Sequence, residues 1–161
     1  MYFTTSRPPP PPLAQRARRL IPERLRAVKA EFKRLCDTGV CRPSNSAWAT
    51  PIHLVPRRSG EWRICGDFRR LNSVTTPDKY PILNLRDFPN FVHGKNFFSV
   101  LDLRRAYQQI PIAPEDIPKT AVITPVGLFE YLVMVEGLRN AGQTFQRYMH
   151  RALGDLDFLF I

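Results

Sequence analysis

The apolar run of residues 97–101, which ends on the carboxylate of Asp102, constrains the fold more than any other stretch of the chain. The run reads Phe-Phe-Ser-Val-Leu and predicts a strand that is buried on both faces. Because a buried, unpaired carboxylate costs free energy or changes its pKa, Asp102 needs a partner at the end of such a strand. A divalent metal is one candidate partner, and a capping or turn role is the alternative.

Cations and an aromatic ring follow Asp102 at once, in the order Arg104, Arg105 and Tyr107. This layout suits a phosphate-bearing substrate that is held through a metal. The longer run F-S-V-L-D-L-R-R-A-Y-Q-Q-I-P at residues 98–111 resembles the first catalytic motif of reverse transcriptases from gypsy-type LTR retrotransposons and, more distantly, from retroviruses.

Three further motifs resemble the same family and occur in the family's order. They read S-x-W-A-x-P-I at residues 46–52, W-R-I-C-G-D-F-R-R-L-N at 62–72 and G-L-R-N-A-G-Q-T-F-Q-R-Y-M at 137–149. The resemblance implies an α+β fold: the fingers and part of the palm of a right-hand polymerase, with an antiparallel palm sheet backed by helices. It divides the chain into a proline-rich, basic leader (1–20), a fingers-like region with its connector (21–96) and a partial palm (97–161).

The resemblance implies RNA-directed DNA synthesis, in which a primer 3′-hydroxyl attacks the α-phosphate of a deoxynucleoside triphosphate. In a complete site, two Mg²⁺ ions hold the attacking and leaving oxygens. Asp102 would be the catalytic residue and a metal ligand, and the backbone of Leu103 would be a second, weaker ligand. Tyr107 would stack beneath the deoxyribose and exclude a 2′-hydroxyl by steric clash.

The remaining site residues fall into two implied groups. Those that would bind the incoming nucleotide are Arg57, Arg58, Arg63, Arg105, Ala106, Tyr107 and Glu136. Those that would contact the template–primer are Asp67, Arg69, Asn72, Gln143 and Gln146. The implied partners are an RNA or DNA template–primer, deoxynucleoside triphosphates, and the C-terminal palm, thumb and RNase H regions of a parent polyprotein.

Departures from the family pattern argue against activity of this chain alone. The family carries Y-x-D-D after the strand that begins at Leu156, and the sequence ends at Ile161 without those aspartates. Mg²⁺ needs near-octahedral oxygen sets, so we do not expect one carboxylate to bind the ions well. Val135 and Glu136 replace the usual Pro-Phe, and a carboxylate there opposes a triphosphate. Gly142 replaces a larger residue near the surface that would contact the template–primer.

Composition sets broader bounds. A net charge of +10 over 161 residues suits a polyanionic partner, or simply keeps the chain soluble. Cys36, Cys41 and Cys65 form no C-x-x-C pair, which predicts small buried side chains in a reducing compartment rather than a disulfide framework or a zinc site. With no membrane-length apolar run and no signal-peptide core, we expect an intracellular protein, cytoplasmic or nuclear.

Periodic apolar residues predict two long helices. The first runs from Pro22 to Gly39 with the buried stripe Leu25, Val28, Phe32 and Leu35. The second runs from Asn140, as its cap, to Leu153 with the stripe Ala141, Phe145, Tyr148, Met149 and Ala152. A short helix and a turn are expected within residues 87–96.

Alternating patterns predict two hairpins. Strands at residues 47–56 and 62–68 flank a basic turn that either grips phosphates or is simply solvated. The prolines of the first strand predict a sheet edge. A second hairpin pairs residues 121–124 with 128–135, and another strand begins at Leu156. The proline run at residues 8–12 predicts a stiff linker or a surface-hugging arm, with an SH3-type ligand as the alternative.

Three functions fit these observations. The first is an RNA-directed DNA polymerase domain, truncated and inactive alone. The second is a nucleic-acid-binding remnant that holds template–primer without chemistry, with an affinity that falls steeply with salt. The third is a non-functional fragment of a decayed retroelement that folds poorly, because an unpaired apolar strand edge promotes aggregation.

Overall fold

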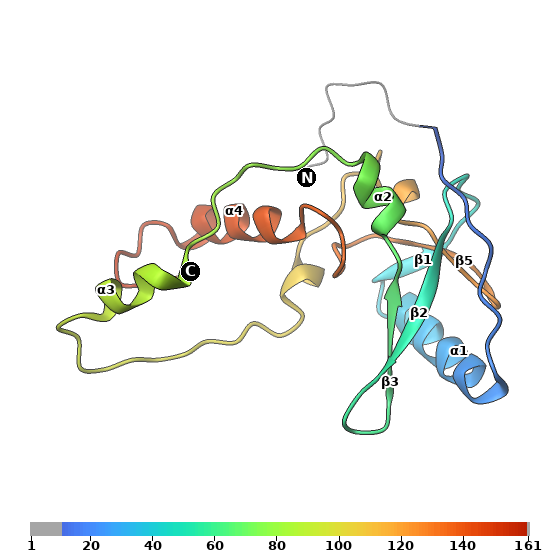
Figure 1. The fold of residues 1–161 in the computed structure, drawn as a ribbon, viewed down its shortest axis with the longest axis horizontal. Coiled ribbons are helices and arrows are strands. Elements are labelled where there is room, and N and C mark those ends of the chain that lie inside the picture. The colour runs from blue at the N-terminus through green and yellow to red at the C-terminus, as the bar shows by residue number, and fades with distance from the viewer. Residues whose placement is uncertain (1–10, 161) are drawn as a thin grey trace.

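The computed structural model describes residues 11–160, which build one five-stranded sheet, with some helices beside it and others that extend away from it to one side (Figure 1). The strands are β1 (Cys41–Pro43), β2 (Thr50–Pro56), β3 (Trp62–Gly66), β4 (Val122–Thr124) and β5 (Gly127–Tyr131). Their order is β1-β5-β4-β2-β3, with β2 and β4 parallel and the other neighbours antiparallel. The α+β class is therefore confirmed, and the sheet that these residues form is mixed.

The helices of the described residues are of two kinds. The α-helices are α1 (Pro22–Asp37), α2 (Arg69–Val74), α3 (Phe88–Val92) and α4 (Ala141–Leu153). The short 3₁₀ helices are η1 (Leu85–Asp87), η2 (Ala106–Gln109) and η3 (Ile117–Thr120). None of these helices has the length and apolar character that a membrane crossing needs.

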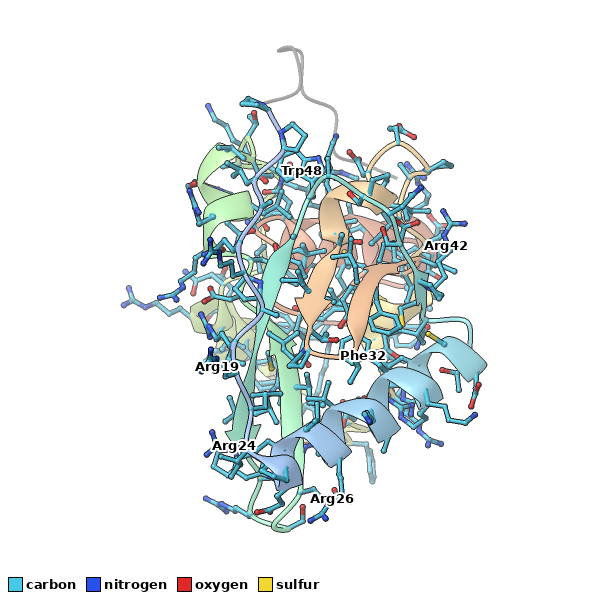
Figure 2. The ribbon with its side chains drawn as sticks, turned by 90° about the vertical axis from the view of Figure 1, so that its right-hand side faces the viewer. Arg19, Arg24, Arg26, Phe32, Arg42 and Trp48 are labelled. Atoms are coloured by element: carbon cyan, nitrogen blue, oxygen red, sulfur yellow. The ribbon has the colours of Figure 1, made fainter. Side chains whose placement is uncertain are left out.

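Helix α1 confirms the first predicted helix. It begins at Pro22, which suits the first turn because its missing N–H would have no helical partner there, and Gly39 follows its end at φ 69°. Val28, Phe32 and Leu35 are buried. Figure 2 shows Phe32 between α1 and the sheet, where its ring centroid lies 4.7 Å from that of Phe129 on β5. The apolar stripe therefore attaches the helix to the sheet.

Both predicted hairpins are present. Strands β2 and β3 pair in the register Leu54↔Ile64, and Gly60 at φ 83° closes the turn between them. Strands β4 and β5 pair around Ile123↔Leu128. The predicted edge position of the first strand is wrong, because β2 lies between β3 and β4. Of its two prolines, Pro56 lies beyond the contact with β4, which involves only Thr50 and Pro51 of β2. The carbonyl of Pro51 accepts a hydrogen bond from the Asp67 N–H at 2.8 Å.

The described part of the leader lies along the sheet. Residues 13–15 pair with Ala49, which donates to the Leu13 carbonyl at 3.0 Å and accepts from the Gln15 N–H at 2.8 Å. Arg18 then reaches Asp67 at 2.6 Å, and Asp67 also accepts two hydrogen bonds from Arg69. Residues 13–18 are thus a surface-hugging arm, whereas the proline run begins outside the described residues.

The apolar run at residues 97–101 is not a strand, so that prediction is wrong for this structure. Phe97, Val100 and Leu101 are 96%, 93% and 83% exposed. Figure 1 shows the chain that follows α3 as an open loop that lies away from the sheet. A strand persists only where neighbours take up its backbone N–H and C=O groups, and no strand within residues 11–160 pairs with this run.

Two predictions near the C-terminus are also corrected. Residues 156–160 form turns rather than the start of a strand, and the ring of Phe160 packs on Phe88 and Phe91 at 5.2 and 5.5 Å; Ile161 lies outside the described residues. Helix α4 forms as predicted, but Asn140 makes no side-chain cap. Its amide instead donates to the Thr76 carbonyl and accepts from the Asp78 N–H, because these tertiary partners replace the helical one.

The stripe of α4 is buried only in part. Ala141 is 4% exposed, whereas Tyr148 is 44% exposed, and the polar Thr144 and Gln146 are buried instead. The start of the helix is buried, whereas its C-terminal turns are more exposed. Periodicity alone therefore placed the helix correctly but its buried face only in part.

We predict that Phe32→Ala removes about 3–5 kcal/mol from the free energy of unfolding, because it leaves a cavity between α1 and β5. Phe97→Ala is the matched control and should change that free energy by less than about 0.5 kcal/mol, since this ring is 96% exposed. Urea titrations followed by circular dichroism measure both. Equal losses in the two variants would contradict the burial described here.

The arm-to-sheet ion pair predicts an acid dependence. Hydrogen bonds from Arg69 and Arg18 hold the pKa of Asp67 well below its ordinary value, although partial burial opposes this shift. An ionised carboxylate with a lowered folded-state pKa stabilises the fold above about pH 4, which is its ordinary pKa. This contribution to the free energy of unfolding is lost as the pH falls towards and through the folded-state pKa. Urea midpoints measured from about pH 6 to pH 2 should therefore fall less in Asp67→Asn than in the unaltered chain.

Asp157→Asn is the matched control for this prediction, because Asp157 is an exposed carboxylate outside the arm contact. It should leave the acid profile of the urea midpoint unchanged. A profile for Asp67→Asn that overlays the unaltered chain would contradict the proposed stabilisation by Arg18 and Arg69.

Candidate functional site

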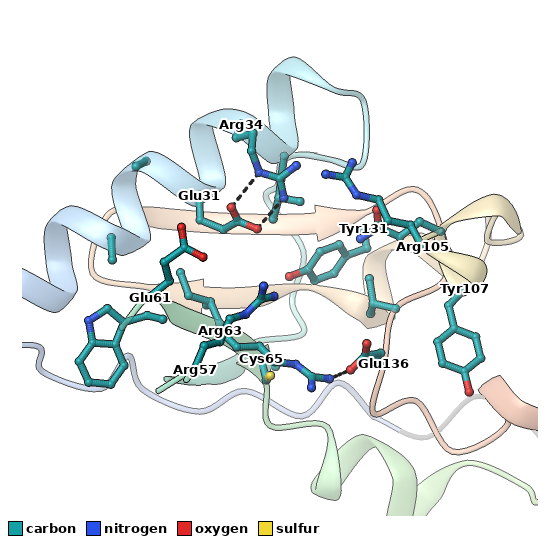
Figure 3. Close-up of a pocket in the computed structure, with 18 of the residues that line it drawn as sticks. Glu31, Arg34, Arg57, Glu61, Arg63, Cys65, Arg105, Tyr107, Tyr131 and Glu136 are labelled. Carbon is teal, nitrogen blue, oxygen red and sulfur yellow. Dashed lines mark hydrogen bonds and ion pairs between the residues drawn. The ribbon is translucent and has the colours of Figure 1, made fainter. Parts of the chain in front are cut away.

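A pocket of about 940 Å³ lies between α1, the β2–β3 hairpin and the segment that leads into η2 (Figure 3). Six of the sequence-predicted nucleotide residues line it, namely Arg57, Arg63, Arg105, Ala106, Tyr107 and Glu136. Leu103, the predicted backbone ligand, lines it as well. Arg58 is not among the lining residues, although it is the immediate neighbour of Arg57. The volume is in the range of small-ligand sites.

The basic hairpin supplies one wall of the pocket. Arg57 begins the turn, where its N–H donates to the Glu61 carbonyl at 2.8 Å and fixes the turn geometry. Arg63 lies on β3 opposite Val55, with its side chain about half exposed. Because the strand alternates its faces, Arg63 and Cys65 share one side of β3. The hairpin register thus sets which cations face the pocket.

Helix α1 supplies a second wall that sequence reasoning missed. Arg34 donates two hydrogen bonds to Glu31, at 2.9 and 2.6 Å. These bonds are the largest cause of the lowered pKa of Glu31, which the charges of Arg105 and Arg57 lower further against the opposing effect of burial. The i,i+3 spacing of Glu31 and Arg34 was a visible signal, but only the packing of α1 shows that this pair faces the pocket.

Glu136 and Arg63, which both line the pocket, form an ion pair (Figure 3). Both side chains are about half exposed, so solvent screens their attraction. Gly137 follows Glu136 at φ 90°, a conformation that favours glycine and turns the chain back towards α4. Glu136 is thereby the carboxylate partner of one of the four arginines that line the pocket.

The segment before η2 places the predicted sugar-contacting residue. Arg105 adopts the left-handed conformation, with φ 53° and ψ 46°, and η2 begins at the next residue. Tyr107 then packs edge-on against Phe145 of α4, with ring centroids 5.6 Å apart at 81°. This contact holds the ring at the pocket wall, so its position depends on α4 as well as on its own segment.

The predicted metal ligand lies outside the pocket lining. Asp102 is exposed, as is most of the segment around it. Within residues 11–160, no three His, Cys, Asp or Glu side chains gather in a way that could hold a metal ion. The donor set formed by these residues therefore does not fit a two-ion magnesium site.

Four of the five predicted template–primer residues make internal contacts. Asp67 and Arg69 belong to the arm contact, while Asn72 donates to the Gly137 carbonyl at 2.8 Å and accepts from the Arg139 N–H at 2.9 Å. Gln146 is buried on α4 with its Nε2 atom 2.9 Å from Nε2 of His150, and Gln143 is half-buried on the same helix. Contact with a template stays a prediction for all five.

Comparison with protein families gives one match, described as reverse transcriptase (RNA-dependent DNA polymerase), over residues 55–159. Curated relatives include the retrovirus-related Pol polyproteins of the Drosophila melanogaster transposons 297 and opus. They are 37% and 40% identical over 134 and 125 residues, which are 80% and 74% of this chain and 13% and 12% of theirs. The Tf2-3 polyprotein of Schizosaccharomyces pombe is 32% identical over 136 residues, or 84% of this chain and 10% of its own.

Solved structures with the same fold include two of the foamy viral protease-reverse transcriptase. The one in complex with double-stranded DNA has a TM-score of 0.80 at 18% identity and covers 95% of this chain and 32% of that chain. The one with an RNA/DNA hybrid has a TM-score of 0.77 at 17% identity and covers 93% and 20%. At these identities the likeness concerns the fold alone.

The chain spans only about a tenth of the length of these curated relatives. The family match nevertheless covers well over half of the chain, and it confirms the resemblance drawn from the motifs. This chain therefore belongs to the reverse transcriptase (RNA-dependent DNA polymerase) family and covers part of that domain.

Proposed function

We propose that this chain carries the nucleotide pocket and part of the template–primer binding surface of an RNA-directed DNA polymerase. The observation that carries this proposal is the pocket itself, where arginines from α1, the β2–β3 hairpin and the η2 segment converge. Convergent guanidinium groups are suited to a triphosphate, because each presents paired N–H donors to phosphate oxygens.

The proposed roles follow the position of each side chain. Arg57, Arg63 and Arg105 would hold the triphosphate, and the N–H of Ala106 would add a backbone donor. Tyr107 would lie beneath the deoxyribose. Its packing against Phe145 supports a role in rejecting a 2′-hydroxyl, because a braced ring excludes an added atom better than a mobile one.

The complete reaction is proposed only for the whole protein to which such a domain belongs. Template-directed synthesis in this family uses Mg²⁺, for which Asp102 would be one ligand. Since the described residues do not assemble a fitting donor set, we derive no catalytic step through the metal. The fingers and partial-palm division of the chain, at residues 21–96 and 97–161, likewise stays part of the proposal.

A template–primer is the proposed macromolecular partner. The solved relatives named above were studied with double-stranded DNA and with an RNA/DNA hybrid. The net charge of +10 supports a polyanionic partner here as well. The second candidate function, nucleic-acid binding without chemistry, is favoured by one observation: Asp102 is exposed and outside the pocket lining.

The first test measures binding and primer extension on one sample of the 161-residue chain. We predict that a fluorescent RNA/DNA template–primer binds and that raising salt from about 50 to 200 mM weakens binding at least tenfold, since phosphate contacts release counterions. We predict no extension with Mg²⁺ and all four deoxynucleotides. Extension would contradict the expected inactivity. Absent or salt-independent binding would contradict the proposal that the chain binds a template–primer through its phosphates.

The second test isolates the pocket from the template. We predict that Glu136→Gln tightens the binding of inorganic tripolyphosphate about fivefold, because it releases Arg63 and removes one repulsive charge worth about 1 kcal/mol. Arg105→Gln should weaken the same binding by a similar factor. Isothermal titration calorimetry at low salt gives both dissociation constants.

Glu23→Gln is the matched control, since it removes an exposed carboxylate in the first turn of α1 that does not line the pocket. It should leave tripolyphosphate binding within about twofold of the unaltered chain. If Glu23→Gln and Glu136→Gln tighten binding equally, overall charge rather than the pocket controls the affinity, and the proposed site is wrong.

A further inference from the structure

Two of the three cysteines meet in the fold, although they are isolated in the sequence pattern. The sulfur atoms of Cys36 and Cys41 lie 3.5 Å apart. All three cysteines are free thiols, and Cys65 lies apart from the pair on β3. The predicted burial holds for Cys41, whereas Cys36 and Cys65 are half-buried. We propose that Cys36 and Cys41 form a dithiol site that small-molecule disulfides oxidise to an intramolecular disulfide bond.

The local backbone fixes this pair. Cys36 lies in the last turn of α1 and Cys41 is the first residue of β1. Between them, the N–H of Gly39 donates to the Cys36 carbonyl at 3.0 Å and that of Val40 donates to the Leu35 carbonyl at 2.9 Å. Because these bonds define the turn, the two thiols are held together by structure and do not meet only through chain flexibility.

The separation suits a covalent bond. A disulfide bond is about 2.05 Å long, so the sulfurs, now 3.5 Å apart, need to approach by only about 1.5 Å. A metal ion is the competing occupant of a thiol pair. Within the described chain, no third His, Cys, Asp or Glu joins these sulfurs to complete a metal-binding set, whereas a disulfide needs only the two.

The two thiols differ in access, which sets the order of the reaction. Cys36 is half-buried, whereas Cys41 is 2% exposed. Burial is the largest cause that raises the pKa of the Cys41 thiol, to about 12, and the contact with Cys36 raises it further. Cys36 is therefore the thiol that meets the reagent, and Cys41 completes the exchange.

The exchange balances without another reactant. The Cys36 thiolate attacks one sulfur of oxidised glutathione, forms a mixed disulfide and releases one glutathione thiolate. The Cys41 thiolate then attacks the Cys36 sulfur, forms the Cys36–Cys41 bond and releases the second glutathione thiolate. Two protein thiols are oxidised, one disulfide is reduced to two thiols, and the protons of the cysteines pass through solvent to the leaving thiolates.

The new bond would lie directly behind the pocket. Cys41 pairs in register with Tyr131, which lines the pocket, and α1 carries the lining pair Glu31 and Arg34. A covalent link between α1 and β1 would therefore hold one pocket wall to the edge of the sheet. The proposal depends on the thiol geometry alone and holds whether or not the pocket binds a nucleotide.

The test treats the reduced 161-residue chain with oxidised glutathione at mildly alkaline pH and then alkylates the remaining thiols before mass spectrometry. We expect a product that has lost two hydrogens, carries no glutathione and is alkylated once, at Cys65. Peptide mapping should show a Cys36–Cys41 link. A stable glutathione adduct at Cys36, or a link that includes Cys65, would overturn the proposal.

Three variants make each step visible. Cys41→Ser should accumulate the mixed disulfide at Cys36, and Cys36→Ser should resist oxidation because only the buried thiol of the pair remains. Cys65→Ser is the matched control and should form the link at the rate of the unaltered chain. Equal rates of link formation in native buffer and in concentrated urea would also overturn the proposal, since the fold would then contribute nothing to the pairing.

Discussion

The pocket depends on the burial of one face of α1 against the sheet. Val28 and Phe32 are almost completely buried, and Phe32 packs directly on Phe129 of β5. The neighbouring edge of the same helix is thereby set facing the pocket, with Glu31 and Arg34 in its lining. An apolar contact thus determines where charged groups lie, because the helix cannot turn its polar edge away without exposing its stripe.

The charges of the pocket are balanced within the protein. Glu31 binds Arg34 and Glu136 binds Arg63, so two of the lining arginines already have carboxylate partners. The other two lining arginines, Arg57 and Arg105, take part in neither of these ion pairs, and their charges lower the pKa of Glu31. The two carboxylates therefore weaken the attraction of the pocket for an anion. Because the Glu136 side chain is exposed, we expect an anion to displace it from its arginine more easily than Glu31.

Sequence reasoning succeeded where the determining interactions are local. The helix that starts at Pro22 and the turn at Gly60 carry their own signals, and both were predicted. The run at residues 97–101 was mispredicted because a doubly buried strand needs distant partners that its own pattern cannot supply. Asn140 failed as a cap for a similar reason, since the tertiary partners at Thr76 and Asp78 took its amide.

The candidate site followed the same division. Motif resemblance singled out seven residues that line the pocket, which lie on the β2–β3 hairpin, on residues 103–107 and at Glu136, and their roles stay predictions. It missed the Glu31 and Arg34 pair, whose place in the pocket depends on how α1 packs. Asn72, for which the resemblance implies a template role, joins α2 to the 137–139 loop in the fold, and its template role stays a prediction.

The sheet combines local and long-range strand pairing. Each hairpin joins neighbours in sequence, but the hairpins meet only where Thr50 and Pro51 of β2 pair with Val122 and Ile123 of β4. That junction closes a long loop that includes the exposed run at residues 97–101. Loop-closure entropy grows only logarithmically, so halving such a loop would change its cost by about 0.6 kcal/mol. The stability of the sheet should therefore depend little on the length of this connection. The complete sheet nevertheless forms only when β2 of one hairpin pairs with β4 of the other.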